Sequence, residues 1–140
     1  VYELRPPTLD EFGLVSALCE QANRYQTPDL AITLTMPEQL PPLPAAVEVA
    51  IYRITQEALT NVARHANARH CALSLSLAAR NQISLEVCDD GQGLPVNYSA
   101  GVGLISMRER AAELGGSCVT GSADVGGTRI VVRLPLAQEA

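Results

Sequence analysis

Lysine is absent from this chain of 140 residues, and all ten of its basic residues are arginine. A Walker-type phosphate loop needs a lysine beside the phosphates, and a eukaryotic-type protein kinase needs one on a strand. Enzymes that form a Schiff base with their substrate need a lysine amine. The composition therefore excludes these three classes of protein.

Long apolar runs and an excess of positive charge are also missing. No apolar run approaches the roughly 18 residues of a membrane-spanning helix, and the first residues lack the pattern of a signal peptide. The net charge of −5 gives no general attraction to nucleic acid or to anionic membranes. With 47% hydrophobic and 18% charged residues, we expect residues 1–140 to form one folded domain.

Paired cysteines are missing as well. Cys19, Cys71, Cys88 and Cys118 are scattered, with no C-x-x-C pair among them. Three of the four lie in apolar stretches, where we expect them to pack as buried free thiols. A reducing, cytoplasmic compartment is the expectation that follows.

Hydrophobic periodicity and turn residues predict the order of the elements. We expect helices over residues 9–25, 45–66 and 104–114, and strands over 31–35, 71–77, 83–87, 117–120 and 128–134. Thr8 to Glu11 has the capping-box pattern, and Gly115-Gly116 is a helix-stop signal. Strands that follow one another at both ends should pair locally, whereas a doubly wound parallel sheet needs crossover helices. The predicted fold class is therefore α/β, an α+β sandwich in which helices pack on one face of a mixed sheet.

The long helix has two contrasting edges. Its apolar arc consists of Val47, Ile51, Ile54, Ala58 and Val62. A polar stripe of Glu57, Asn61 and Arg64 runs directly beside that arc at helical spacing. The stripe is either the ordinary boundary of an amphipathic helix or one wall of a polar site.

Three glycine-rich segments follow the strands. Asp89-Asp90-Gly91-Gln92-Gly93 is either a plain turn or a site where a buried Asp89 carboxylate accepts a hydrogen bond from an amine of a flat ring. Gly101-Val102-Gly103-Leu104 opens a helix, whose free N–H groups can bind phosphate. Gly126-Gly127-Thr128 is either a hairpin or a hydroxyl donor to phosphate. Each segment is ambiguous alone, but their order along the chain is more specific.

That order resembles the GHKL ATPases, which include gyrase, mismatch-repair ATPases, a heat-shock chaperone and the histidine kinases. The matching segments are Glu57 to His65 (the N box), Asp89 to Gly93 (D-x-G-x-G), Gly101 to Leu104 (the second glycine box) and Gly126 to Thr128 (the closing G-T). Within that superfamily the chain resembles the catalytic ATP-binding domain of sensor histidine kinases of the nitrate-sensor class. The markers of that subgroup are Leu4-Arg5-Pro6, Gly13-Leu14 and Met107 to Arg110.

The resemblance implies a role for each matching residue. Asn61 would ligate the Mg²⁺ that bridges the ATP phosphates, Arg64 would contact phosphate, and His65 would face the nucleotide. Glu57 matches the acid that activates water in the hydrolysing relatives; in a kinase it would be catalytic by supporting the Mg²⁺ shell.

The remaining roles concern the base, the ribose and the phosphates. Asp89 would accept the adenine amine, and Thr128 would back the adenine pocket. Glycines and one leucine would complete the ATP site: Gly91 and Gly93 at the ring, and Gly101, Gly103 and Leu104 at phosphate and ribose. Residues 94–101 would form a short ATP lid.

The resemblance also implies partners. The chain would transfer the γ-phosphoryl of ATP to a histidine on separate dimerisation helices, and a response regulator would act downstream. His65 and His70 lack the acidic context of an acceptor, so the 140 residues alone should not phosphorylate themselves. They should also be mainly monomeric, because the family's dimer contacts belong to the separate dimerisation helices. The domain would be the cytoplasmic part of a membrane-anchored sensor and would not bind nucleic acid.

Two alternatives remain open within this fold. One is a nucleotide-binding module that has lost turnover, and the other is an anti-sigma-factor type serine kinase or a hydrolysing ATPase. Asp90 stands where many relatives have asparagine, and Val102 where histidine is frequent in close relatives. Neither departure removes a group named above.

Overall fold

The structure is a computed structural model that describes residues 7–78, 81–92, 102–123 and 126–136. Its helices are α1 (Pro7–Tyr25), α2 (Ala45–Asn61), the π-helix η1 (Val62–Ala66) and α3 (Val102–Glu113). Its strands are β1 (Ala31–Thr35), β2 (His70–Ala78), β3 (Gln82–Asp89), β4 (Ser117–Ser122) and β5 (Thr128–Pro135). None of the described helices combines the length and the apolar character that crossing a bilayer requires.

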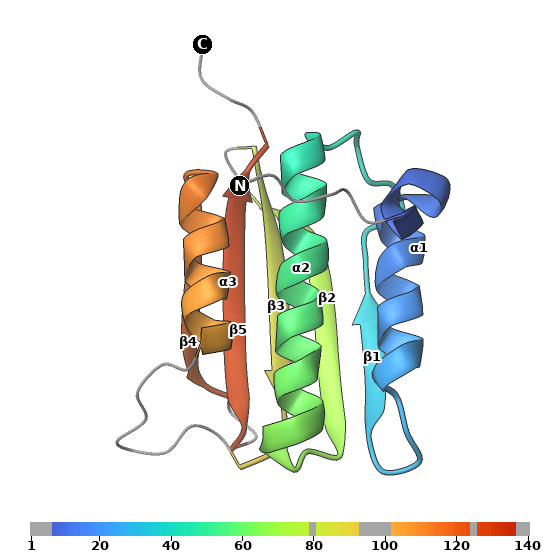
Figure 1. Cartoon of the computed structure of the whole chain (residues 1–140), viewed down its shortest axis with the longest axis vertical. Coiled ribbons are helices and arrows are strands. Elements are labelled where there is room, and N and C mark those ends of the chain that lie inside the picture. The colour runs from blue at the N-terminus through green and yellow to red at the C-terminus, as the bar shows by residue number, and fades with distance from the viewer. Residues whose placement is uncertain (1–6, 79–80, 93–101, 124–125, 137–140) are drawn as a thin grey trace.

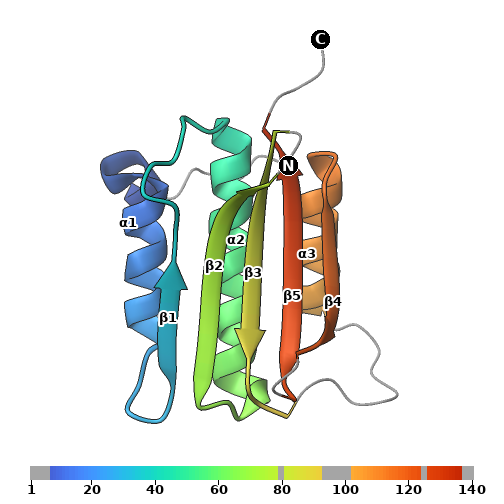
Figure 2. The same ribbon diagram turned by 180° about the vertical axis from the view of Figure 1, so that it is seen from behind.

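The five strands form one mixed sheet in the order β1-β2-β3-β5-β4. Strand β1 runs parallel to β2, and the other three neighbouring pairs are antiparallel. Figure 1 shows α1, α2 and α3 side by side in front of the sheet, and Figure 2 shows the opposite face without a covering helix. The predicted mixed sheet with helices on one face is confirmed.

The core lies between α2 and the central strands, because side chains on a strand alternate between the two faces of the sheet. Every second residue of β3 is buried, from Ile83 through Leu85 to Val87. The apolar arc predicted on the long helix packs against this face, and all five of its residues are buried: Val47, Ile51, Ile54, Ala58 and Val62. The helix-facing side of the sheet is therefore apolar up to the end of β3.

The first helix differs from the sequence prediction. It begins at Pro7, which suits the first helical position because proline has a fixed φ and needs no N–H partner. Thr8 therefore lies inside the helix, and its predicted role as a cap is wrong. Gly13 interrupts α1 with φ 79° and ψ 174°, a backbone region that only glycine adopts readily. Hydrophobic periodicity does not predict this kink.

The long helix also differs from its prediction. It is α-helical only to Asn61, and residues 62–66 continue as a π-helix. A π-turn holds more residues than an α-turn, so residues after Asn61 advance by a smaller angle around the axis. Asn67 ends the segment in the left-handed conformation, with φ 51°. Arg64 therefore does not continue the stripe of Glu57 and Asn61 at regular α-helical spacing.

The other boundaries lie within about two residues of their predicted positions. Strand β3 extends to Asp89, two residues beyond the predicted strand, and α3 starts at Val102, two residues before the predicted helix. Arg80-Asn81-Gln82 and Asp124 to Gly127, whose residue types predict the turns between the last two pairs of strands, lie in part outside the described residues. All four cysteines are free: Cys71 and Cys118 are buried, Cys88 is partly exposed and Cys19 is exposed. The expectation of three buried thiols is thus correct for two.

Two consecutive glycines end α3 in different ways. Gly115 adopts φ +78°, and the N–H groups of Gly115 and Gly116 donate to the carbonyls of Ala112 and Ala111 at 3.0 and 2.9 Å. This is a Schellman motif, which satisfies the last carbonyls of a helix. Gly116 also lies tight against β5, where an added Cβ would overlap the Arg133 carbonyl oxygen and come within 2.8 Å of Leu134 Cδ2.

Replacing Gly116 with alanine should therefore destabilise the chain by about 1–3 kcal/mol, the usual range for an overpacked site. The matched control is Gly121→Ala on β4, because a Cβ at Gly121 would meet no atom within 4 Å. Urea unfolding followed by circular dichroism measures both changes. Equal stability of the two variants would contradict the close approach of Gly116 to β5.

Candidate functional site

The predicted motifs converge at one end of the molecule. Strand β3 and helix α2 with η1 end there, while β5 and α3 begin there, at the lower edge of the view in Figure 1. Segments that are far apart in the sequence, around residues 61, 89, 102 and 128, are thus brought to the same end of the sheet. The arrangement places the N box, the D-x-G-x-G turn and the closing G-T around one region.

Asp89 is the buried acid of this region. It follows Val87 on the helix-facing side of β3 and is only 5% exposed. Its Oδ1 accepts a hydrogen bond from the backbone N–H of Gly91 at 2.8 Å and a longer one from that of Thr128 at 3.4 Å. No other described residue donates to the carboxylate, so its Oδ2 has no protein partner among them. Burial of a carboxylate is costly unless its oxygens find donors, so this site favours a ligand that brings one.

Gly127 explains how β5 approaches this carboxylate so closely. An added Cβ at Gly127 would overlap the Asp89 carbonyl oxygen and lie 2.6 Å from Oδ1. The turn before β5 holds Gly127 in place, because the Ala123 N–H donates to the Gly127 carbonyl at 2.9 Å. A side chain at this position would push Thr128 away from Asp89 or displace the carboxylate.

The polar stripe of the long helix reaches the same end of the fold. Glu57 and Asn61 are partly buried, and Arg64 in η1 is exposed. Within the described part of the chain, no hydrogen bond engages the Asn61 carboxamide, so its oxygen can accept one or ligate a cation. His65 lies in η1, and the structure does not describe its side chain.

The start of α3 contributes backbone rather than side chains. Gly103 lies in the first turn of the helix, where N–H groups have no intrahelical acceptor. Leu104 is 4% exposed and belongs to the hydrophobic core, so only its backbone can face a ligand. Gly93, Gly101 and the predicted lid over 94–101 lie outside the described residues, whereas Gly91 is described and partly buried.

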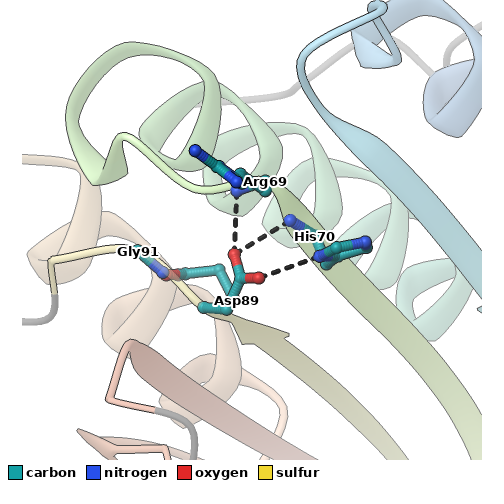
Figure 3. A network of polar contacts seen from close by, with 5 residues as sticks. Arg69, His70, Asp89 and Gly91 are labelled. Carbon is teal, nitrogen blue, oxygen red and sulfur yellow. Dashed lines mark hydrogen bonds and ion pairs between the residues drawn. The ribbon is translucent and has the colours of Figure 1, made fainter.

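Asp90, the next residue after Asp89, makes a different set of contacts. Its Oδ1 accepts hydrogen bonds from the backbone N–H groups of Arg69 at 2.8 Å and His70 at 2.9 Å. Its Oδ2 lies 2.9 Å from His70 Nδ1. Figure 3 shows this network at the start of β2, beside Asp89 and Gly91. The donors from His70, the backbone N–H first and then the ring, lower the pKa of Asp90 to about 2, so it is ionised at neutral pH.

A buried thiol lies opposite Asp89 on the neighbouring strand. Cys71 pairs with Asp89 in the β2–β3 register. Burial, and after it the charge of Asp89, raises the pKa of the Cys71 thiol to about 12. Cys71 is therefore a neutral, apolar neighbour of the site and supplies no thiolate for nucleophilic or metal chemistry.

Sequence reasoning missed two features of this region. It named Gly127 within the closing G-T but gave a role only to Thr128, although glycine at the start of a strand is a signal of close backbone approach. It noted Asp90 only as a departure from relatives, because the partner at His70 follows from the β2–β3 register and not from any local pattern.

Known sensor kinases are similar to this chain in sequence. It is 35% identical over 138 residues to the sensor histidine kinase LiaS of Bacillus subtilis, covering 97% of this chain and 38% of that protein. It is 34% identical over 128 residues to the nitrate/nitrite sensor protein NarX of Escherichia coli, covering 89% of this chain and 21% of that one. The chain thus spans well under half the length of these curated relatives.

Solved structures show the same fold. The blue-light activated histidine kinase of Erythrobacter litoralis matches with a TM-score of 0.75 at 20% identity, over 91% of this chain and 45% of that chain. The ATP binding domain of PrrB from Mycobacterium tuberculosis matches with a TM-score of 0.66 at 25% identity, over 88% of this chain and 93% of that chain.

The family comparison agrees with both. The model of the histidine kinase-, DNA gyrase B- and HSP90-like ATPases matches residues 46–138. That span runs from the start of α2 to beyond the end of β5 and so includes the N box, the D-x-G-x-G turn, the second glycine box and the closing G-T. The chain therefore belongs to the family of histidine kinase-, DNA gyrase B- and HSP90-like ATPases.

Proposed function

We propose that residues 1–140 form the ATP-binding catalytic domain of a two-component sensor histidine kinase, which gives the γ-phosphoryl of ATP to a histidine on separate dimerisation helices. The observation that carries the proposal is the buried Asp89 carboxylate, which has backbone donors on one oxygen and no described protein donor on the other. The similarity to named sensor kinases over most of the chain supports the same function.

The base of ATP is the part that Asp89 would recognise. The exocyclic amine of adenine is a donor, and a charged acceptor makes a stronger hydrogen bond than a neutral one. The backbone N–H groups of Gly91 and Thr128 hold Oδ1, which fixes the carboxylate and leaves Oδ2 for the amine. Gly91, Gly93 and Thr128 would line the ring.

The phosphates are the part that the N box and α3 would hold. The Asn61 oxygen fits Mg²⁺, because this cation prefers oxygen ligands and keeps several waters. Mg²⁺ neutralises phosphate charge when it is bound. Arg64, His65 and the first N–H groups of α3, at Gly103 and Leu104, would contact phosphate and ribose with Gly101, while Glu57 supports the metal shell.

The finer class and the partners belong to the same proposal. Similarity to NarX over 89% of the chain supports the nitrate-sensor class, and LiaS is similar over 97%. The partners would be acceptor helices of the same kinase and a response regulator, with the domain in the cytoplasm. Phosphoryl transfer depends mainly on positioning and charge neutralisation, which a nucleotide domain can provide to a histidine that arrives from another segment.

Asp89→Asn should weaken the binding of ATP and ADP by roughly 10- to 100-fold, because a hydrogen bond to a charged group contributes about 1.5–3 kcal/mol. The affinities for both nucleotides should fall by the same factor, since ATP and ADP share the adenine. Isothermal titration calorimetry measures the affinities, and the exposed Asp29→Asn is the matched control. Unchanged ATP affinity in Asp89→Asn would overturn the adenine assignment.

Asn61→Ala should abolish the gain in ATP affinity that Mg²⁺ produces, while adenosine binds as before. The reason is that the substitution removes an oxygen ligand without touching the group that reads the base. Titrations of ATP and adenosine with and without Mg²⁺ separate the two effects. A gain from Mg²⁺ that survives in the variant would place the metal at other residues.

Gly127→Ala should weaken adenosine and ATP binding together by roughly 10-fold or more, because the added methyl group displaces the Asp89 carboxylate that both ligands share. Gly121→Ala on the adjoining strand, where a Cβ meets nothing within 4 Å, is the control. The measurement is calorimetry at a temperature where circular dichroism shows both variants to be folded. Normal adenosine binding by Gly127→Ala would contradict the role given to Asp89.

A further inference from the structure

Asp90 links two segments of the chain. One leads from the N box into β2, and the other is the turn that follows β3. The Asp90 carboxylate accepts three hydrogen bonds from Arg69 and His70, and the Asp90 backbone N–H donates to the His70 carbonyl at 3.2 Å. Oδ2 belongs to an ionised carboxylate and can only accept, so His70 Nδ1 carries the proton between them. Four contacts thus join the start of β2 to the exit of β3.

One of these segments comes directly from the N box. Only residues 67–69 separate the end of η1 from His70. The Arg69 carbonyl is held as well, since it accepts a hydrogen bond from the Ala31 N–H at 2.9 Å. The contacts that hold Arg69 and His70 therefore also restrict the position of the preceding segment. That segment is η1 with Arg64 and, before it, the end of α2 with Asn61.

The other segment is the turn that reads the base. Asp90 lies between Asp89 and Gly91, which are themselves joined through Oδ1 of Asp89. That inner contact spans two residues and can form without Asp90. The contacts of Asp90 instead determine where the whole turn sits relative to β2 and the N box.

We propose that Asp90, held by His70, is a positioning residue that sets the adenine-reading turn in register with the metal- and phosphate-holding end of the N box. The inference rests on the proposed function, because it concerns how the two halves of that nucleotide site act together. Asp90 touches neither the base nor the phosphates. It determines whether one nucleotide can engage Asp89 and Asn61 at the same time.

Substitutions at Asp90 test this coupling through two ligands. In Asp90→Ala, the affinity for Mg²⁺-ATP should fall by roughly 5- to 50-fold, in the usual range for coupling between sites. Affinity for adenosine should change by less than about 2-fold, since Asp89, Gly91 and Thr128 remain. The ratio of the two dissociation constants, measured by calorimetry well below the melting temperature, is the readout.

Two further variants distinguish positioning from general stability. Asp90→Asn keeps an oxygen for the two backbone donors. Its ratio of dissociation constants should therefore stay closer to that of the wild type than the ratio of Asp90→Ala, which makes it a partial rescue. His70→Ala removes the ring contact only. It leaves both backbone donors to Asp90 in place, so it should change the ratio less than Asp90→Ala does.

Glu86→Ala is the matched control. Glu86 is also a carboxylate on β3, and it forms a paired contact with Arg129 at 3.1 Å through both oxygens. By the alternation of the strand it lies on the opposite face of the sheet from Asp89. Side-chain donors, Arg129 before Cys88, lower the pKa of Glu86, so its loss removes a comparable charged contact. The ratio of dissociation constants should not change in Glu86→Ala.

The outcomes separate the two proposals. A ratio that stays constant in Asp90→Ala, whether both affinities fall together or only the melting temperature falls, would overturn the positioning role and leave the proposed function intact. A wild-type chain that binds neither adenosine nor Mg²⁺-ATP would overturn the proposed function itself. Selective loss of Mg²⁺-ATP affinity, restored in part by Asp90→Asn, supports both.

Discussion

A buried carboxylate at the end of β3 is the constraint on which the rest of the site depends. Asp89 is only 5% exposed, and a charge in such a position is costly unless donors surround it. The turn at Gly91 and the start of β5 at Thr128 supply donors to one oxygen. Gly127 has no side chain and so lets β5 come close enough to do this. The chain geometry around Asp89 thus follows from the need to satisfy one acid.

The helix layer brings the second half of the site to that acid. The apolar arc of α2 holds the helix on the sheet, and every residue of the arc is buried. Because the polar stripe adjoins the arc, Glu57 and Asn61 are only partly buried at its edge. The same packing that forms the core therefore delivers a polar edge to the end of the sheet where β3 finishes. One amphipathic helix thus contributes its apolar face to the core and its polar edge to the candidate site.

Local sequence signals predicted most of the fold. The features that they did not predict have a physical reason in common. Strand alternation and the Gly115-Gly116 stop located their elements well, since each depends on neighbours in the sequence. The kink at Gly13, the π-helix after Asn61 and the approach of Gly127 to Asp89 depend on packing between distant segments. The Asp90–His70 contact depends on strand register in the same way. The motifs identified the site residues as candidates, and their roles stay predictions.

The charge of the chain determines how such a site can hold a polyanion. With a net charge of −5 and no lysine, the domain offers ATP no general attraction, and Asp89 adds a negative charge where the base would lie. Favourable interactions with the phosphates must then be local. The described groups that can provide them are the Arg64 guanidinium and the N-terminal N–H groups of α3, together with a cation at the Asn61 oxygen. Because these groups lie on separate elements from Asp89, the affinity of the proposed site for ATP would depend on the spacing between them, which is the quantity that the Asp90 contacts would control.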